Sequence, residues 1–442
     1  MILNKKKNNV KTCKFYTFGC KVNQYETQLI REQFLAKGFI ETNKNPDYFI
    51  INGCTVTAAA DRKCRYLLRS LHKKNPSAQI IVTGCFAKNN PDIIFQPGVD
   101  QVIPQEDKLT IIEQINLNPE KKQSLIASKL NAVNLNGCEQ KNLINDFKGH
   151  SRAFVKIQDG CDNFCTYCII PSMRGLPISR DLEIIKQEVA GLAKKGFKEI
   201  VLTGINLGMW SAQSPKTNNR LSYLIEQLLT IKQLQRLRLS SVELIHVDDL
   251  LIKQIENSDK LCAHLHIPLQ SGDDQILKKM NRRYTRDLFL RQIKKIKHQV
   301  SDICFTTDIM VGFPGESEEN FKNTLDFVKK AGFLKVHVFP YSPRPGTKAA
   351  TMPDQIDPKV KDLRKKKLVD LANLTSFELR KKLINKKTFV LFEESSYDGC
   401  WMGYADNYVQ IKVKSAKNLK NFKLPVIISN VTHEQTIAEL VE

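Results

Sequence analysis

The sequence predicts an α/β protein with an N-terminal doubly wound parallel sheet, a central incomplete (β/α)6 barrel and a small C-terminal OB-like β-barrel. Three observations predict this fold class. Short apolar strands alternate with amphipathic helices over 12–104, a second such series begins at Arg152, and only short strands and turns follow Leu379. A chain of 442 residues is long enough for two to four domains. We expect domain boundaries at 10–125, 147–378 and 379–442.

In the N-terminal series, each predicted strand runs into a turn that carries a cysteine. The apolar segments 12–18, 47–53 and 78–84 read as strands, with helices expected over 25–37 and 58–73. The cysteines that follow the three strands are Cys20, Cys54 and Cys85. Ligands gather at the carboxyl ends of strands in a doubly wound sheet. We therefore expect these three thiols to converge.

The central series contains six strand candidates, at AFVKIQ, EIVLTG, RLRLSS, AHLHIPL, FTTDIMVGF and KVHVFPY. Six β/α repeats without clear signs of eight favour an incomplete barrel over a closed one. In such barrels the chemistry lies on the loops that follow the strands. The first of these loops holds three cysteines, and later ones hold Gly204, Glu243 and Gln270.

Charge and cysteine usage indicate a cytoplasmic chain with a polyanionic partner. The 68 Lys and Arg residues outnumber the 46 Asp and Glu residues, for a formal charge of +22. Such a surplus favours nucleic acid, although an AT-rich genome would also enrich lysine. We see neither an apolar run long enough to cross a membrane nor a secretory signal. Twelve cysteines in a cytoplasmic chain point away from structural disulfides.

The tightly spaced group CDNFCTYC carries the strongest chemical signal. Cys161, Cys165 and Cys168 form a C-x3-C-x2-C run, and three thiolates can hold three irons of a cubane cluster. The fourth iron is then open to a substrate or cofactor. A zinc knuckle with a distant fourth ligand and three unrelated thiols are the alternatives. The upstream cysteines carry less local signal, because they lie about thirty residues apart and buried cysteine is common. We expect the other six cysteines to be ordinary thiols.

The CDNFCTYC run, with Tyr167 before its last cysteine, resembles the cluster motif of radical S-adenosylmethionine enzymes. Together with the three upstream cysteine turns, the chain is similar to the methylthiotransferase family. Further segments resemble the subfamily that acts on N6-threonylcarbamoyladenosine in tRNA. They include FGCKVNQYE, INGCTVTAAADRKCR, HLHIPLQSGDDQILKKMNRRYT and HVFPYSPRPGTKAA.

This resemblance implies two 4Fe–4S clusters, each with one open iron. Cys161, Cys165 and Cys168 would hold the cluster that binds S-adenosylmethionine and yields a 5′-deoxyadenosyl radical. Cys20, Cys54 and Cys85 would hold the cluster that carries the sulfur inserted at C2 of the adenine, at position 37 beside the anticodon. The expected cofactor contacts are Tyr167, Gly204, Glu243 and Gln270. The implied partners are the tRNA anticodon stem-loop and an electron donor such as flavodoxin or ferredoxin, with no membrane and no DNA.

Several basic and aromatic segments are candidates for RNA contact. Lys278–His298 is rich in Lys and Arg, and Lys361–Lys367 forms a second basic run. The C-terminal barrel resembles the TRAM RNA-binding domain, and OB-like barrels stack bases on aromatic rings. Its candidate rings, some of which we expect in the core, are Tyr397, Trp401, Tyr404 and Tyr408. His264 and His266 share one face of a strand, and we expect them to line the core or a cavity rather than bind a metal.

Three rival functions remain open at this point. The same chemistry could act on isopentenyl-modified adenosine, although KVNQYE and PLQSGDD favour threonylcarbamoyladenosine. It could also act on an aspartate of a ribosomal protein, which the RNA-like charge disfavours. A non-catalytic zinc or iron–sulfur RNA-binding protein is the rival from another class.

Overall fold

The computed structural model describes residues 10–115, 143–147, 149–212 and 220–441, and the statements below refer to these residues. They form two compact units. The first comprises the described residues up to Asn145 together with Ser172–Arg174, and the second comprises the rest. The expected division into three domains stays a prediction. No helix within the described ranges is long and apolar enough to cross a bilayer.

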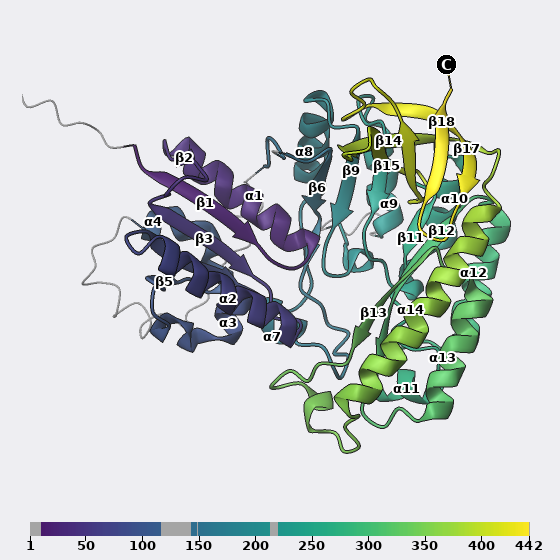
Figure 1. Ribbon diagram of the computed structural model, residues 1–442, viewed down its shortest axis with the longest axis horizontal. Helices are drawn as coiled ribbons and strands as arrows, with labels where there is room; N and C mark the ends of the chain where they lie inside the picture. The colour runs from purple at the N-terminus through teal and green to yellow at the C-terminus, as the bar shows by residue number, and fades with distance from the viewer. Residues whose placement is uncertain (1–9, 116–142, 148, 213–219, 442) are drawn as a thin grey trace, which may run out of the picture. The chain divides into compact units, whose positions relative to one another are not determined.

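The first unit is built on a five-stranded parallel sheet, as the sequence predicts. Its strand order is β2-β1-β3-β4-β5. The strands are β1 (Thr12–Thr17), β2 (Ile40–Glu41), β3 (Tyr48–Gly53), β4 (Gln79–Gly84) and β5 (Gln101–Val102). Strand β3 lies at the centre with all six of its residues buried, because helices cover both faces of such a sheet. This order places the ends of β1, β3 and β4 side by side (Figure 1).

Four α-helices accompany this sheet. They are α1 (Lys21–Ala36), α2 (Ala58–Lys74), α3 (Cys85–Asn89) and α4 (Ile111–Gln114). Short 3-10 turns occupy Pro91–Phe95 and Gln105–Thr110. Helix α2 begins where the sequence predicts, because the Thr57 side chain accepts a hydrogen bond from the Ala60 N–H and caps the helix. Helix α1 begins four residues before its predicted start, directly after Cys20.

The second unit contains the incomplete barrel. One parallel sheet holds β6 (Arg152–Lys156), β9 (Glu199–Thr203) and β10 (Leu237–Leu239), and another holds β11 (His264–His266), β12 (Cys304–Val311) and β13 (Lys335–Pro340). Parallel bridges from Leu237 to Leu261 and from Ser241 to His266 join the two sheets. All six strand candidates are therefore confirmed, in sequence order. A short antiparallel pair, β7 (Gln158–Asp159) and β8 (Ile178–Ser179), flanks them.

Helices follow the strands and pack along one side of the barrel wall. They are α8 (Leu182–Lys194), α9 (Leu221–Leu229), α10 (Asp249–Asn257), α11 (Asp274–Lys279), α12 (Arg286–Gln299), α13 (Glu318–Ala331) and α14 (Pro358–Lys381). The short helix α7 (Ile170–Arg174) ends in the three residues that belong to the first unit. Figure 1 shows α12, α13 and α14 running beside one another along β11, β12 and β13. The predicted basic run Lys361–Lys367 lies within α14.

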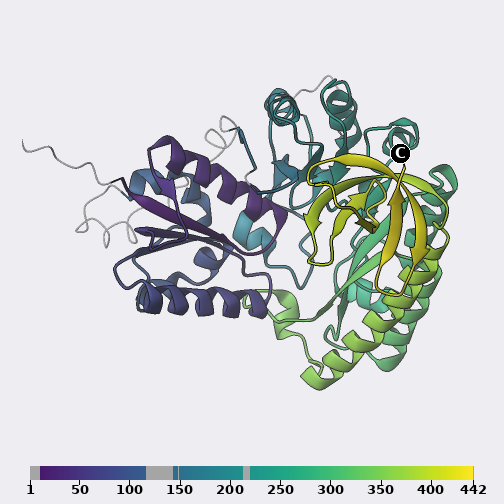
Figure 2. The ribbon, with the colours of Figure 1, turned by 45° about the horizontal axis from the view of Figure 1, so that its top comes forward.

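The C-terminal segment forms a closed five-stranded barrel, which confirms the predicted fold class. Its strands are β14 (Lys387–Ser395), β15 (Cys400–Ala405), β16 (Gln410–Lys414), β17 (Lys423–Val431) and β18 (Thr436–Leu440). They close in the order β14-β15-β16-β18-β17. Apolar residues such as Val390, Phe392 and Ile411 fill its core. Figure 2 shows this barrel in yellow.

A buried ionic network fixes this barrel to the starts of the parallel strands. Glu199 lies between Arg236, at 3.1 Å, and Arg238, at 2.7 Å. Both guanidinium groups also donate to backbone carbonyls of the C-terminal barrel, including those of Tyr404 and Ala405. Each cation therefore has a carboxylate partner on one side and peptide oxygens on the other, as a buried charge requires.

Two of the aromatic rings considered for RNA stacking are part of this interface. The Tyr408 ring stacks on His264 with centroids 4.5 Å apart and on Tyr404 at 4.8 Å. Arg152 lies over the Tyr404 ring and Arg238 over the Tyr408 ring. The ring faces of Tyr404 and Tyr408 are therefore occupied by neighbouring side chains. Tyr397 is fully exposed and remains the candidate for base stacking.

Candidate functional site

The three N-terminal cysteines lie at the carboxyl ends of three adjacent strands. Cys20 follows β1 and caps α1, Cys54 follows β3, and Cys85 is the first residue of α3 after β4. Cys54 and Cys85 are buried, whereas Cys20 is exposed. The geometry follows from the parallel register, in which Gly53 pairs with Gly84 and brings the two strand ends level.

The loops that carry these cysteines pack closely together. A Cβ added to Gly19, whose φ is +101°, would lie 2.9 Å from the Cys54 Sγ atom. Burial, assisted by the neighbouring Cys20 and Cys85 thiols, raises the pKa of the Cys54 thiol to about 11. Burial likewise raises the pKa of Cys85. Thiols in this state bind a cationic iron centre by losing their protons, and the cation then replaces water as the partner of each thiolate.

A buried charge cluster lies beside these thiols, and the sequence analysis missed it. The Glu26 carboxylate binds Arg174 at 2.9 Å and Lys108 at 2.5 Å, and all three side chains are almost fully buried. Arg174 also donates to the Asn23 side chain at 2.7 Å. Its positive charge offsets part of the rise that burial causes in the pKa values of Cys54 and Cys85.

The second cysteine group lies in the loop after β6 and β7, as predicted. The loop is held by the turn between α11 and α12: Thr166 N–H donates to Met280 at 3.2 Å, and the Asn281 side chain donates to the carbonyls of Asn163 and Phe164. Burial raises the pKa of Cys168 to about 12 and also raises that of Cys161. These contacts hold the three thiols on one short, fixed loop.

Arg282 links this loop to the next strand ends. Its guanidinium donates to the Cys165 Sγ atom at 3.4 Å, and it also binds the Glu243 carboxylate. Tyr284 receives a third hydrogen bond from it at 3.0 Å and donates in turn to the carbonyl of Pro268. A small pocket is lined by Asn163, Cys165, Glu243, Ile245, Asn281, Arg282, Arg283 and Tyr284.

This arrangement corrects the interpretation of the basic stripe. Arg282 lies within Lys278–His298, but its side chain is only 5% exposed and faces Glu243. Other members of the stripe are also engaged, since Lys297 donates to the carbonyl of Ala331 at 2.8 Å. Arg283, Arg291 and Lys294 are exposed and remain available to a polyanion.

The four expected cofactor contacts lie at or beside the carboxyl ends of neighbouring barrel strands. Tyr167 packs in the cysteine loop, where burial raises the pKa of its hydroxyl. Gly204 follows β9, and a Cβ there would lie 3.0 Å from the Gln158 carbonyl. Gln270 follows β11 with φ of +66°, held by backbone bonds to Asp308 and Met310. Glu243, after β10, faces the cysteine loop through Arg282.

Asn206 carries a buried side-chain amide that has no hydrogen-bond partner among the described residues. Its side chain is 4% exposed, yet neither its Oδ1 nor its Nδ2 atom has a hydrogen-bond partner among the described residues. An unsatisfied buried amide costs about 1–3 kcal/mol. Its backbone N–H is held by the Gln158 side chain at 2.9 Å. A polar ligand at this strand end would satisfy the amide, so the site fits an amino acid-like cofactor.

Comparisons with known proteins agree with this arrangement. Residues 155–328 match the Radical SAM superfamily, and residues 12–103 match Uncharacterized protein family UPF0004. The chain is 38% identical over 415 residues to the threonylcarbamoyladenosine tRNA methylthiotransferase MtaB of Bacillus subtilis, covering 92% of this chain and 91% of that protein. The corresponding protein of Thermotoga maritima is 38% identical, covering 91% of each chain.

Two further similarities complete the comparison. The tRNA-2-methylthio-N(6)-dimethylallyladenosine synthase of Finegoldia magna is 34% identical, covering 87% of this chain and 84% of that protein. Among solved structures, the radical S-adenosylmethionine methyltransferase TsrM of Kitasatospora setae aligns with a TM-score of 0.54 at 11% identity, covering 77% of each chain. That likeness concerns the fold alone.

Proposed function

The chain belongs to the radical S-adenosylmethionine methylthiotransferase family, and we propose that it methylthiolates C2 of N6-threonylcarbamoyladenosine at position 37 of tRNA. The observation that carries this proposal is the pair of three-cysteine sites at strand ends, one in each unit. The relatives at 38% identity are named for threonylcarbamoyladenosine, which favours that substrate over the dimethylallyl nucleoside.

We assign one 4Fe–4S cluster to each cysteine group and S-adenosylmethionine to the barrel site. When bound, these groups supply a 5′-deoxyadenosyl radical and the sulfur to be inserted, chemistry that no amino acid side chain offers at an unactivated C–H bond. Cys161, Cys165 and Cys168 would hold the first cluster. Cys20, Cys54 and Cys85 would hold the second. Three protein thiolates leave one iron of each cluster open.

The chain's own residues position and shield these groups. Tyr167, Gly204, Glu243 and Gln270 are the proposed cofactor contacts, and we add Asn206 because its amide is buried without a partner among the described residues. The surface cations and Tyr397 would bind the anticodon stem-loop. We further propose an electron donor of the flavodoxin or ferredoxin class, and action in the cytoplasm, where tRNA is modified.

The proposal can be tested by nucleoside analysis. A strain that lacks this gene should lose the 2-methylthio form of threonylcarbamoyladenosine and accumulate its unmodified parent, as measured by mass spectrometry of digested tRNA. Complementation with the wild-type chain should restore the product. Loss of the dimethylallyl derivative instead would transfer the assignment to the rival substrate.

Two cysteine variants separate the roles of the clusters. Cys165→Ala should abolish 5′-deoxyadenosine formation under dithionite and leave tRNA affinity unchanged. Cys54→Ala should retain cofactor cleavage and lose sulfur insertion. Cys400→Ala, a cysteine of the C-terminal barrel, is the matched control and should keep both activities. Sulfur-modified nucleoside from Cys54→Ala would contradict the second cluster.

A further inference from the structure

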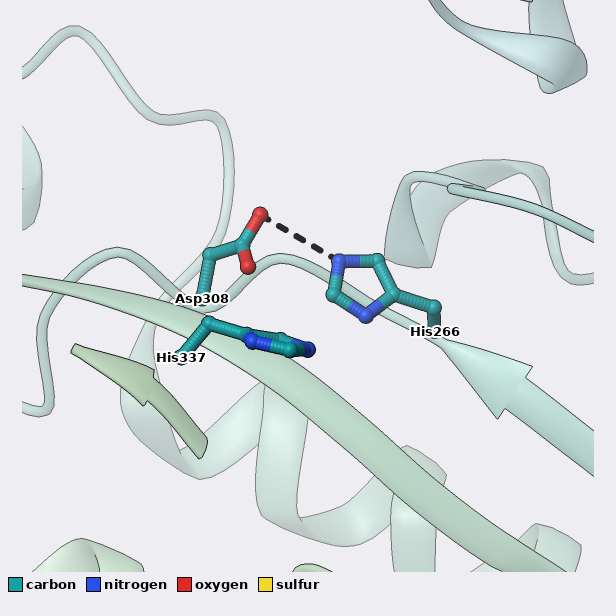
Figure 3. Close-up of side chains that lie close together, drawn as sticks. All are labelled: His266, Asp308 and His337. Carbon is teal, nitrogen blue, oxygen red and sulfur yellow. Dashed lines mark hydrogen bonds and ion pairs between the residues drawn. The ribbon is translucent and has the colours of Figure 1, made fainter. Parts of the chain in front are cut away.

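Three side chains on neighbouring strands of the second unit converge on one point. They are His266 at the end of β11, Asp308 in β12 and His337 in β13 (Figure 3). One ligand atom from each side chain lies within 4.8 Å of the others. Asp308 and His337 are direct partners in the parallel register. From sequence alone we expect His266 to line the core or a cavity, because its two partners lie on separate strands and cannot be recognised there.

The strand alternation places this cluster on the face of the sheet opposite α12. Phe305 faces α12, where the Lys297 ammonium lies 5.8 Å from its ring centroid. Residues two apart along a strand share a face, so Thr306 and Asp308 point the other way. The side chains of His266 and Asp308 are 17% and 29% exposed. Both side chains are therefore largely buried, yet an ion can reach them from solvent.

The distances fit a small divalent ion. A tetrahedral ion with bonds of about 2.0–2.2 Å holds its ligand atoms about 3.3 Å apart. The His266 Nε2 atom lies 3.2 Å from the Asp308 Oδ2 atom, which meets that requirement. The His337 ring would have to move by at most about 1.5 Å to complete the set.

The His266 ring is also oriented as that of a metal ligand would be. Its Nδ1 atom lies 2.9 Å from the Thr306 hydroxyl, which itself lies 3.0 Å from the His264 Nε2 atom. When Nδ1 carries the proton and donates to Thr306, Nε2 presents its lone pair toward Asp308. Metal-bound histidines almost always donate their other N–H to such a partner, which fixes the tautomer.

We propose that His266, Asp308 and His337 form a binding site for a divalent first-row transition ion of the Zn²⁺ class. Two imidazoles and one carboxylate suit such ions, whereas Mg²⁺ and Ca²⁺ prefer oxygen ligands alone. Three protein ligands leave at least one coordination position open for water or a substrate oxygen. The site is distinct from the cysteine groups in its donor atoms and does not depend on the proposed function.

Zinc retention by the cluster-loaded protein tests this proposal. The full-length chain is reconstituted with iron and sulfide so that the cysteines are occupied, treated with ZnCl2, desalted, and analysed for zinc and iron by mass spectrometry. We expect one retained zinc per wild-type chain. Asp308→Asn and His337→Gln should lose it with the iron content unchanged. His298→Gln, an exposed histidine of α12, is the matched control and should retain it.

Cobalt provides a second measurement that does not depend on the variants. Co²⁺ bound by two imidazoles and a carboxylate gives visible ligand-field bands without the intense near-ultraviolet transition of cobalt–thiolate bonds. We expect that spectrum in the wild-type protein, and about 10–100-fold weaker Co²⁺ binding by Thr306→Val. A wild-type chain that retains no zinc, variants that retain as much as the wild type, or a thiolate-type cobalt spectrum would each overturn the proposal.

Discussion

At the scale of single residues, the two cysteine sites share one design, in which an arginine lies close to the thiols. Arg174 is buried in the first unit beside Cys54 and Cys85, and Arg282 donates to Cys165. Three thiolate ligands place negative charge on a bound iron–sulfur cluster, and a guanidinium held nearby offsets that charge. Neither arginine could be predicted from sequence, because Arg174 binds Glu26 148 residues earlier and Arg282 reaches Cys165 across 117 residues.

Arg282 should tune the reduction potential of the barrel cluster. Replacing it by glutamine removes one positive charge and the guanidinium donor to the Cys165 sulfur, so the reduced cluster loses stabilisation and the potential becomes more negative. Potentiometric titration followed by electron paramagnetic resonance measures this shift. We also expect cofactor cleavage to slow by about 10–100-fold.

The Arg291→Gln variant is the control, because it removes the same charge from an exposed position of α12 outside the pocket at Cys165. It should leave the potential near that of the wild type. Equal potentials in Arg282→Gln and Arg291→Gln would show that Arg282 does not act on the cluster.

At the scale of elements, the sequence was most informative where strands are continuous apolar runs. Strands β3 and β4 are buried on both faces, and the cysteines at their ends could be placed from that pattern alone. The start of α1 was missed because its first turn carries polar residues such as Asn23, whose buried amide donates to the Phe18 carbonyl and accepts from Arg174.

The glycine that ends β4 should be indispensable for the first cysteine group. Gly84 has φ of +85°, and a Cβ there would lie 2.2 Å from the Asn52 Oδ1 atom and 2.7 Å from the Gly53 carbonyl oxygen. Gly84→Ala therefore adds a steric clash to the cost of the left-handed backbone and displaces Cys85. We expect a lower melting temperature and loss of about half of the reconstituted iron.

Gly38→Ala measures the free-energy cost of placing alanine in a left-handed backbone conformation without a steric clash. Gly38 has the same φ of +85°, but nothing lies within 4 Å of its added Cβ. We expect it to cost only about 1–2 kcal/mol and to leave the iron content intact. Iron content that is equal in the two alanine variants would argue against a role for Gly84 in placing Cys85.

At the scale of the second unit, the C-terminal barrel and the parallel strands are held together by charge as well as by apolar packing. Arg236 and Arg238 donate to barrel carbonyls, and both pair with Glu199, while Arg236 also pairs with Asp406 at 2.6 Å. The side chain of Glu199 is fully buried, and its three arginine partners overcome the cost of burial and lower its pKa to about 2. The carboxylate therefore stays ionised throughout the range in which the protein works.

Glu199→Gln should destabilise this unit by about 3–5 kcal/mol, because it leaves the buried Arg238 guanidinium without its carboxylate partner. Since folding lowers the pKa of Glu199 from 4.5 to about 2, its contribution is complete above pH 4.5 and is lost only as the pH falls toward 2. The difference in free energy of unfolding between wild type and variant should therefore be the same at pH 6 and pH 8, as measured by chemical denaturation. Glu183→Gln, in an exposed pair with Lys186, should cost less than about 1 kcal/mol. A Glu199→Gln variant no less stable than Glu183→Gln would mean that packing alone holds the barrel in place.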